Sequence, residues 1–172
     1  MVKTLRYSLL AMLAMVCNVA FADEVKFDFD NDYATLFPTL KGVSSSTGDN
    51  QHDGDFTEAT TATLEGYTVT VSAAKEGVTN ANRIWTSSPR LRMYSGNLTI
   101  SAPAGKKIKN IVCNSRKWDA GNTANVGTLD NTKKTWEGEA ETVVITIAKN
   151  TQMKSLTVST APQEIVDITN TP

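Results

Sequence analysis

The sequence predicts an all-β protein, a two-sheet antiparallel β-sandwich of jelly-roll-like topology. No segment longer than about ten residues places its apolar residues at helical spacing, which argues against long helices. Short runs in which apolar residues alternate with threonine recur instead, as in the YTVTV run at 67–71. Turn-forming residues separate these runs. Many short strands joined by turns are typical of two packed antiparallel sheets.

The expected strands follow one another at short intervals. They are residues 25–29, 63–73, 90–94, 97–101, 107–114, 142–148 and 154–160. Turn signals lie at residues 65–66, 95–97, 103–105 and 149–150. Alternation of valine and threonine over 68–72 gives that strand one dry face and one wetter face, as expected for a sheet that covers a core.

Two long stretches and a polar terminus lie outside this pattern. Residues 41–56 and 115–134 are long for connections within one domain, and long loops on a rigid sandwich are where function concentrates. From residue 161 onward the chain is polar and contains two prolines. We therefore expect a sandwich domain over residues 23–160 and a C-terminal tail or linker over 161–172.

The first 22 residues resemble a cleavable secretory signal peptide. Lys3 and Arg6 precede an apolar run at 9–16, and Ala20 and Ala22 supply the small residues that a signal peptidase site requires. The run is too short to cross a bilayer, which takes about 20 apolar residues. The sequence thus predicts cleavage after Ala22, no transmembrane span, and a secreted, periplasmic or cell-surface location.

The two cysteines bear on the same question. Cys17 raises the alternative of a lipid-anchored protein, but Val16 precedes it where that site requires a small residue. Cleavage after Ala22 leaves Cys113 as the sole cysteine, so no intrachain disulfide is expected. The full chain has a net charge of −1 with acids and bases interspersed, which disfavours a nucleic-acid partner. The oligomeric state stays open.

A set of short motifs and single residues lies along the chain in a fixed order. It consists of residues 27–29 (FDF), 54–57 (GDFT), 82–85 (NRIW), 91–94 (LRMY), Leu98, Ile100, Pro103, Gly105, Lys106, Ile108, Ile111, Trp136, Gly138, Val143, Ile145, 154–156 (KSL) and Val158. This order resembles a β-sandwich module that recurs in secreted and surface proteins of Bacteroidota gut bacteria. The resemblance covers most of the chain after residue 22, contains no catalytic signature, and implies a non-catalytic attachment or carbohydrate-binding piece. Cys113 stands where that pattern leads us to expect a larger apolar residue.

An acidic loop at 49–55 (DNQHDGD) partly matches a calcium-binding loop. Oxygen-bearing residues alternate there, and a glycine occupies the sixth position, which lets the chain wrap a hard cation. The third and twelfth positions, Gln51 and Thr60, depart from the pattern. The alternative is a solvated turn. The candidate ligands of this structural calcium are Asp49, Asp53 and Asp55, and no other cofactor is expected.

Aromatic and cationic residues concentrate between residues 83 and 94. If Leu91 and Met93 point inward, alternation places Arg90, Arg92 and Tyr94 on the outer face of the same strand. Flat aromatic rings stack on sugar faces, and arginines donate to hydroxyls or carboxylates. The alternative is that the tryptophans at 85 and 136 pack in or beside the core. The candidate ligand-binding residues are Arg83, Trp85, Arg92, Tyr94 and Trp118.

Catalytic patterns are weak. His52 is the single histidine, and no serine lies in a Gly-x-Ser-x-Gly context. Cys113 falls in an apolar strand, where a buried small hydrophobe is expected. Glu137, Glu139 and Glu141 alternate, but the run EGEAE is interpreted as an exposed turn and not as a pair of glycosidase acids. No catalytic residue is predicted.

These observations favour a secreted, non-catalytic module that binds carbohydrate or the cell surface. Its expected partner is a glycan or a surface protein. Two alternatives remain at this stage: a structural or protein-interaction module of a surface protein, and a glycosidase-type enzyme.

Overall fold

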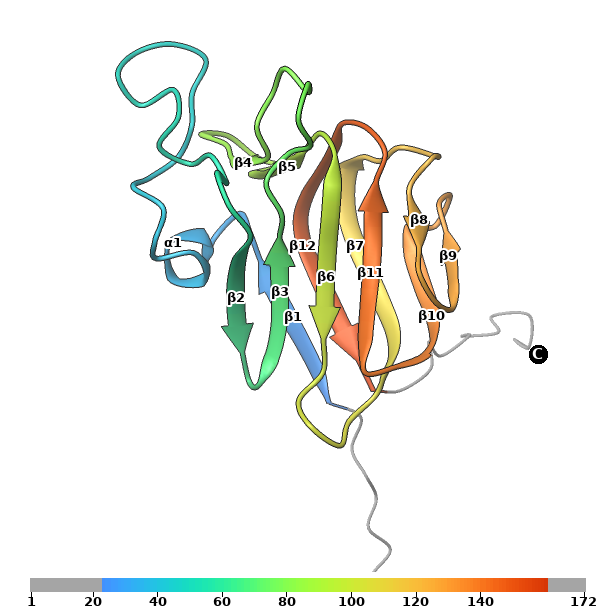
Figure 1. Ribbon diagram of the computed structural model, residues 1–172. Helices are drawn as coiled ribbons and strands as arrows, with labels where there is room; N and C mark the ends of the chain where they lie inside the picture. Colours follow the sequence, from blue (N-terminus) through green and yellow to red (C-terminus); the bar gives the residue numbers. More distant parts are fainter. Residues whose placement is uncertain (1–22, 161–172) are drawn as a thin grey trace, which may run out of the picture.

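The computed structural model describes residues 23–160 and shows the predicted class, an all-β sandwich of two antiparallel sheets (Figure 1). The expected signal peptide (1–22) and tail (161–172) lie outside the described residues. Within residues 23–160, no helix is long and apolar enough to span a membrane.

Twelve strands and one short helix make up the described chain. In order they are β1 (Glu24–Asp28), α1 (Tyr33–Leu36), β2 (Thr60–Leu64), β3 (Tyr67–Val71), β4 (Arg83–Ile84), β5 (Leu91–Met93), β6 (Gly96–Ser101), β7 (Ile108–Lys117), β8 (Thr123–Ala124), β9 (Thr128–Asp130), β10 (Thr135–Ala140), β11 (Thr142–Ile147) and β12 (Thr151–Ser159).

The larger sheet has the order β4-β5-β12-β7-β10-β9, and β1 also pairs with β12. One edge of β12 is therefore shared, with Thr151–Met153 facing β5 and Ser155–Ser159 facing β1. The smaller sheet has the order β2-β3-β6-β11-β8. From β6 to β12 the chain passes repeatedly between the sheets, as in a jelly roll.

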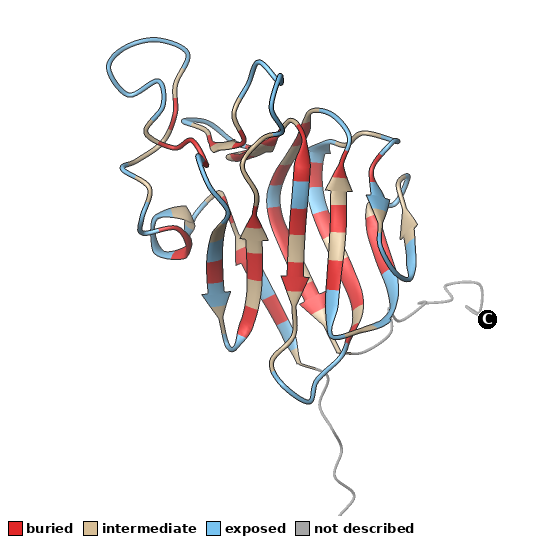
Figure 2. Ribbon diagram, in the orientation of Figure 1, coloured by how far each residue is buried: buried red, intermediate tan, exposed pale blue. Residues whose placement is uncertain are grey.

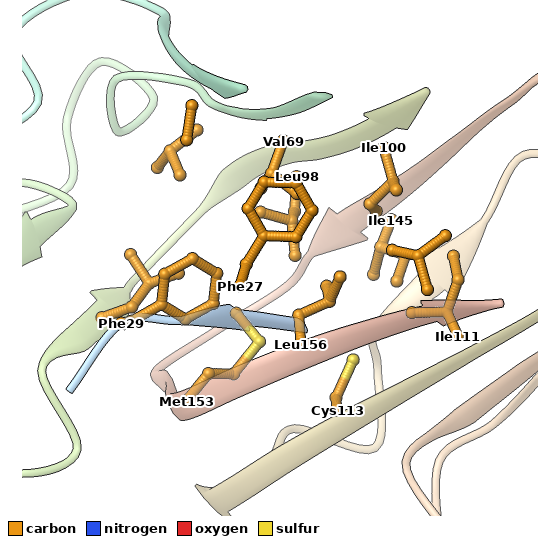
Figure 3. Packing of buried hydrophobic residues seen from close by; sticks show 14 of the residues in the cluster. Phe27, Phe29, Val69, Leu98, Ile100, Ile111, Cys113, Ile145, Met153 and Leu156 are labelled. Atoms are coloured by element: carbon orange, nitrogen blue, oxygen red, sulfur yellow. The ribbon is translucent and has the colours of Figure 1, made fainter. Parts of the chain in front are cut away.

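The core lies between the two sheets. Buried and exposed residues alternate along most strands, as the striped ribbons of Figure 2 show. Phe27 and Leu156 from the larger sheet face Val69 and Ile145 from the smaller one (Figure 3), and all four are fully buried. Trp136 is also fully buried, which confirms the core interpretation of this residue. Alternation of apolar and polar residues thus places one face of each sheet in the core.

One expected strand is in fact a hairpin. The single strand predicted over 63–73 is divided into β2 and β3, which pair with each other through the register Leu64 to Tyr67. The two residues between them, Glu65 and Gly66, have φ values of 51° and 82°. Positive φ at both positions is the signature of a type I′ turn, which matches the twist of the flanking strands.

The prediction of irregular structure was wrong in two places. The run EGEAE, interpreted as an exposed turn, lies largely in β10, which pairs with both β7 and β9. The expected loop at 115–134 contains β8 and β9. Glycine and glutamate are uncommon in strands, so strand propensity alone does not predict β10. Its inward residue Trp136 supplies the burial that holds the strand in the sheet.

The outer face of the smaller sheet is lined by uncharged hydroxyl groups. The register aligns one row across β2, β3, β6 and β11, consisting of Thr63, Thr68, Ser101 and Thr142. A neighbouring row consists of Thr61, Thr70, Thr99 and Val144. Hydroxyl groups bond across strands within these rows, with 2.7 Å between Thr61 Oγ1 and Thr70 Oγ1.

Candidate functional site

Four of the five expected ligand-binding residues gather on β4, β5 and the residues that follow them. The guanidinium of Arg92 lies 4.7 Å from the centre of the Trp85 ring, and that of Arg83 lies 5.7 Å from it. Arg83 and Arg92 are register partners on neighbouring strands, and Tyr94 lies two residues beyond Arg92. We call Arg83, Trp85, Arg92 and Tyr94 the Trp85 cluster.

The cluster is built from alternation on two short strands. Leu91 and Met93 are fully buried, so Arg92 points away from the core, as the sequence predicts. Ile84 is likewise buried between Arg83 and Trp85. All four cluster residues are partly exposed. A guanidinium that lies over an indole ring is attracted by the ring's negative face, which holds both groups in place.

Arg83 has a carboxylate partner on its other side. The backbones of Asp55 and Arg83 form an isolated bridge, and Arg83 Nε lies 3.3 Å from Asp55 Oδ1. Only 11% of the Arg83 side chain and 6% of the Asp55 side chain are exposed. Removing either partner would therefore leave a nearly buried charge unpaired.

A buried amide holds the chain on either side of the cluster. Asn82 is fully buried and donates from Nδ2 to the carbonyls of Ser72 and Ser95, at 2.9 and 2.8 Å. Its Oδ1 accepts from the Tyr94 amide at 2.7 Å. Asn82 thus joins the residues before β4, after β5 and after β3, and fixes where Tyr94 leaves the sheet. These contacts join segments that are apart in the sequence, so no local pattern predicts the role of Asn82.

Arg90 fixes the turn that carries Trp85. Its Nη1 donates to the carbonyls of Trp85 and Thr86 at 3.1 and 3.0 Å, and its Nε donates to the Asp30 carbonyl at 2.9 Å. Its guanidinium also lies 4.9 Å from the centre of the Tyr33 ring. Arg90 was expected on the outer face beside Arg92. Its guanidinium instead donates to backbone carbonyls and so holds the turn that carries Trp85.

Other positively charged side chains lie near Arg92. Burial, together with the nearby charges of Arg116 and Arg83, lowers the pKa of its guanidinium, while Tyr94 acts in the opposite direction through a side-chain hydrogen bond. An arginine nevertheless stays charged at physiological pH. Arg92 therefore keeps its charge, and binding of an anion would reduce its repulsion from the neighbouring cations.

Trp118, the fifth expected residue, does not join the Trp85 cluster. It follows β7, which is separated from β4 by β5 and β12. Its ring packs against the core, and its Nε1 donates to Asn131 Oδ1 at 2.8 Å. Asn131 in turn donates to the carbonyls of Ala120 and Asn122. The side chain is partly exposed, but its polar edge is already used within this loop.

In the acidic loop, where calcium is expected, Asp55 contacts three protein side chains. Its Oδ1 accepts from Ser44 Oγ at 2.6 Å, and its Oδ2 lies 2.8 Å from His52 Nδ1. With the Arg83 contact, both carboxylate oxygens have protein partners. Asp49 is exposed and Asp53 partly exposed. Within residues 23–160, no group of three or more acidic, histidine or cysteine residues is arranged around a common metal position.

Hydrogen bonds link Ser44, Asp55 and His52, but not in the order that nucleophilic catalysis requires. The serine hydroxyl donates to the carboxylate and not to the imidazole, and Ser44 is fully buried. A nucleophilic serine needs an imidazole within hydrogen-bond reach. Ser44 Oγ also accepts from the Gly54 amide at 3.0 Å, so these contacts tie the two ends of the long loop together.

Both glutamates of β10, Glu137 and Glu139, are exposed, and Glu139 pairs with two lysines. Glu139 lies 3.1 Å from Lys109 Nζ and 3.4 Å from Lys107 Nζ. Hydrogen bonds from Lys109 and Lys107 lower the pKa of Glu139. A glycosidase general acid needs the opposite shift, to a raised pKa.

The pKa values of Asp130 and Cys113 are also altered. Hydrogen bonds from the amides of Lys133 and Thr132 lower the pKa of Asp130. Burial raises the pKa of the Cys113 thiol to about 12. Cys113 is only 4% exposed, as expected for a small core residue, so it lacks the thiolate character of a nucleophile.

Comparison with known proteins finds no matching family model, no matching curated protein and no matching solved structure.

Proposed function

We propose that this protein is a non-catalytic carbohydrate-binding module that acts outside the cytoplasm and attaches to glycan or to the cell surface. The observation that carries the proposal is the Trp85 cluster, in which a partly exposed indole lies beside two guanidinium groups. Export through the leader at 1–22 and the resemblance to Bacteroidota surface modules are part of the same proposal.

The chemistry of the cluster suits a sugar. An aromatic ring presents a flat apolar surface that packs against the C–H face of a pyranose, and guanidinium and phenol groups donate to its oxygens. Arg83 is held by Asp55, and the turn bearing Trp85 is held by Arg90. A binding surface fixed before the ligand arrives loses less entropy on binding.

A glycan array followed by titration calorimetry tests the proposal. The purified protein should bind at least one glycan, and Trp85→Ala or Arg92→Gln should weaken that binding by about tenfold or more, which corresponds to about 1.4 kcal/mol. Lys109→Gln is the matched control, because Lys109 is a partly exposed cation of the same sheet that pairs with Glu139. A wild-type protein that binds no glycan would refute the proposal.

The hydroxyl-lined face of the smaller sheet favours a second candidate, a protein-interaction module. The rows that begin at Thr61 and Thr63 form a surface without charge, and such a surface can contact another protein without burying an unpaired ion. Thr68→Lys together with Thr99→Lys should abolish capture of a protein partner from the source cell surface. Retention of glycan binding in that double variant would separate the two candidates.

A further inference from the structure

The register of the larger sheet extends the Trp85 cluster into a row that crosses four strands. Arg83 on β4 pairs with Arg92 on β5, Arg92 pairs with Gln152 on β12, and Gln152 pairs with Lys117 on β7. Register partners place their side chains on the same face of a sheet. Neighbouring strands lie about 4.8 Å apart, so the row spans about 14 Å. We call Arg83, Arg92, Gln152 and Lys117 the basic row.

A further cation lies beside this row. Arg116 immediately precedes Lys117, at the irregularity where the pairing of β7 with β12 shifts register, and both residues are exposed. The charge of Arg116 acts on Arg92, so the two guanidinium groups are electrostatic neighbours. Gln152 lies between Arg92 and Lys117 in the row, and its side-chain Nε2 donates to Asn150 Oδ1 at 3.2 Å.

The charges of the row are balanced at one end only. Arg83 is paired with Asp55, but among residues 23–160 no carboxylate lies within ion-pair distance of Arg92, Arg116 or Lys117. Elsewhere on the described surface some lysines have such partners and others do not, so the row is distinguished by three cations without a carboxylate partner that lie close together. In a chain whose net charge is −1, a local excess of unpaired cations marks a surface complementary to an anion.

We propose that the basic row binds an acidic polysaccharide whose sugars carry carboxylate groups, a polyuronate. One sugar ring packs against Trp85, and successive carboxylates meet Arg92 and the Lys117 end of the row. The proposal rests on the carbohydrate-binding function proposed above and specifies its ligand class.

Two observations favour this ligand. The first is the length of the row, since unpaired cations at Arg92 and at Lys117 are two strand spacings, or about 10 Å, apart, and a chain with recurring charges reaches both. The second is that a guanidinium of the row already binds a carboxylate, in the Arg83–Asp55 pair. The planar guanidinium fork matches the planar carboxylate.

Affinity electrophoresis and calorimetry with two matched polymers provide the test. Polygalacturonate should retard the protein, whereas carboxyl-reduced polygalacturonate, which has the same backbone without the charge, should bind about tenfold or more weakly. Arg92→Gln and Lys117→Gln should each weaken binding to polygalacturonate by about tenfold, the effect of losing one charge-assisted hydrogen bond. Lys109→Gln, on the same strand β7, should leave it unchanged. Circular dichroism and Tm confirm that each variant is folded.

The outcomes separate this inference from the proposed function. Equal binding of the two polymers would overturn the polyuronate while leaving carbohydrate binding intact. No binding to either polymer or to any arrayed glycan would overturn both. A Lys109→Gln variant weakened as much as Arg92→Gln would show general attraction to polyanions and overturn the basic row. Tighter binding to dextran sulfate than to polygalacturonate would assign the row to sulfate groups and refute the carboxylate.

Discussion

Replacement of Asp55 by alanine tests how the long loop at 41–56 is attached to the sandwich. The Asp55 carboxylate accepts from the fully buried Ser44 hydroxyl and pairs with Arg83, and only 6% of it is exposed. Asp55→Ala removes both of these contacts and also the contact with the exposed His52. It leaves the Ser44 hydroxyl without its acceptor and the Arg83 guanidinium without its counter-ion.

The expected loss follows from these two contacts. A hydrogen bond to a charged acceptor contributes about 1.5–3 kcal/mol. Loss of one partner of a largely buried ion pair raises the total to about 3–5 kcal/mol. For a domain of this size each kcal/mol lowers Tm by about 3 °C, so Tm should fall by about 10–15 °C. Asp55→Asn keeps an acceptor for Ser44 but not the charge, and should lose about half as much.

Urea unfolding followed by tryptophan fluorescence, with Tm from calorimetry, measures the effect. Asp49→Ala is the matched control, because Asp49 belongs to the same loop but is exposed. It should change the free energy of unfolding by less than about 0.5 kcal/mol. The reasoning fails if Asp55→Ala costs no more than Asp49→Ala.

Four further outcomes are expected. Because both oxygens of Asp55 already have protein partners, Tm should be the same in calcium as in EDTA, and a rise of Tm with calcium would instead support the calcium site predicted in the acidic loop. Cys113, whose pKa burial raises to about 12, should react with a thiol reagent only after urea unfolding, and rapid labelling of the folded protein would contradict its burial. Hydrogen bonds hold the pKa values of Asp130 and Glu139 below their ordinary values, so their stabilisation is complete above the unfolded pKa of about 4 and is lost as pH falls through the lower folded values. The Asp130→Asn, Glu139→Gln double variant should therefore lose less Tm than the wild type on acidification below about pH 4, and an identical loss would argue against this origin. A Cβ added at Gly138 would lie 2.7 Å from the buried indole ring, so Gly138→Ala should cost about 1–3 kcal/mol in urea unfolding, and an unchanged midpoint would show that the ring has room to move.

Alternation predicts strands only where burial differs between the two faces. In β3 the valines are buried and the threonines partly exposed, and the predicted alternation is confirmed there. In β10 the inward side chain is Trp136, and the space beside it is left by Gly127 and Gly138, where an added Cβ would collide with the ring. Glycine and glutamate at the other positions remove the local signal, so this strand becomes evident only from its neighbours.

Local alternation predicts one part of the candidate site, whereas the other part depends on how the strands pair. The outward direction of Arg92 follows from the burial of Leu91 and Met93 on either side of it, which the sequence predicts. The approach of Arg92 to Arg83 depends on the register of β4 with β5, and the role of Asp55 depends on a bridge between distant segments. Neither is encoded by local periodicity, because both arise from pairings that only the folded chain brings about.

The position of β12 has a consequence for how the protein is made. The last described strand, β12, pairs with β7 on one edge and with both β1 and β5 on the other. The first strand, β1, therefore cannot pair within the larger sheet until β12 is present. Contacts between residues so far apart in sequence form slowly. A chain under synthesis cannot complete the larger sheet until residue 159 has left the ribosome. Until then β7 lacks its partner strand on one side, and β1 and β5 have no central strand to pair with.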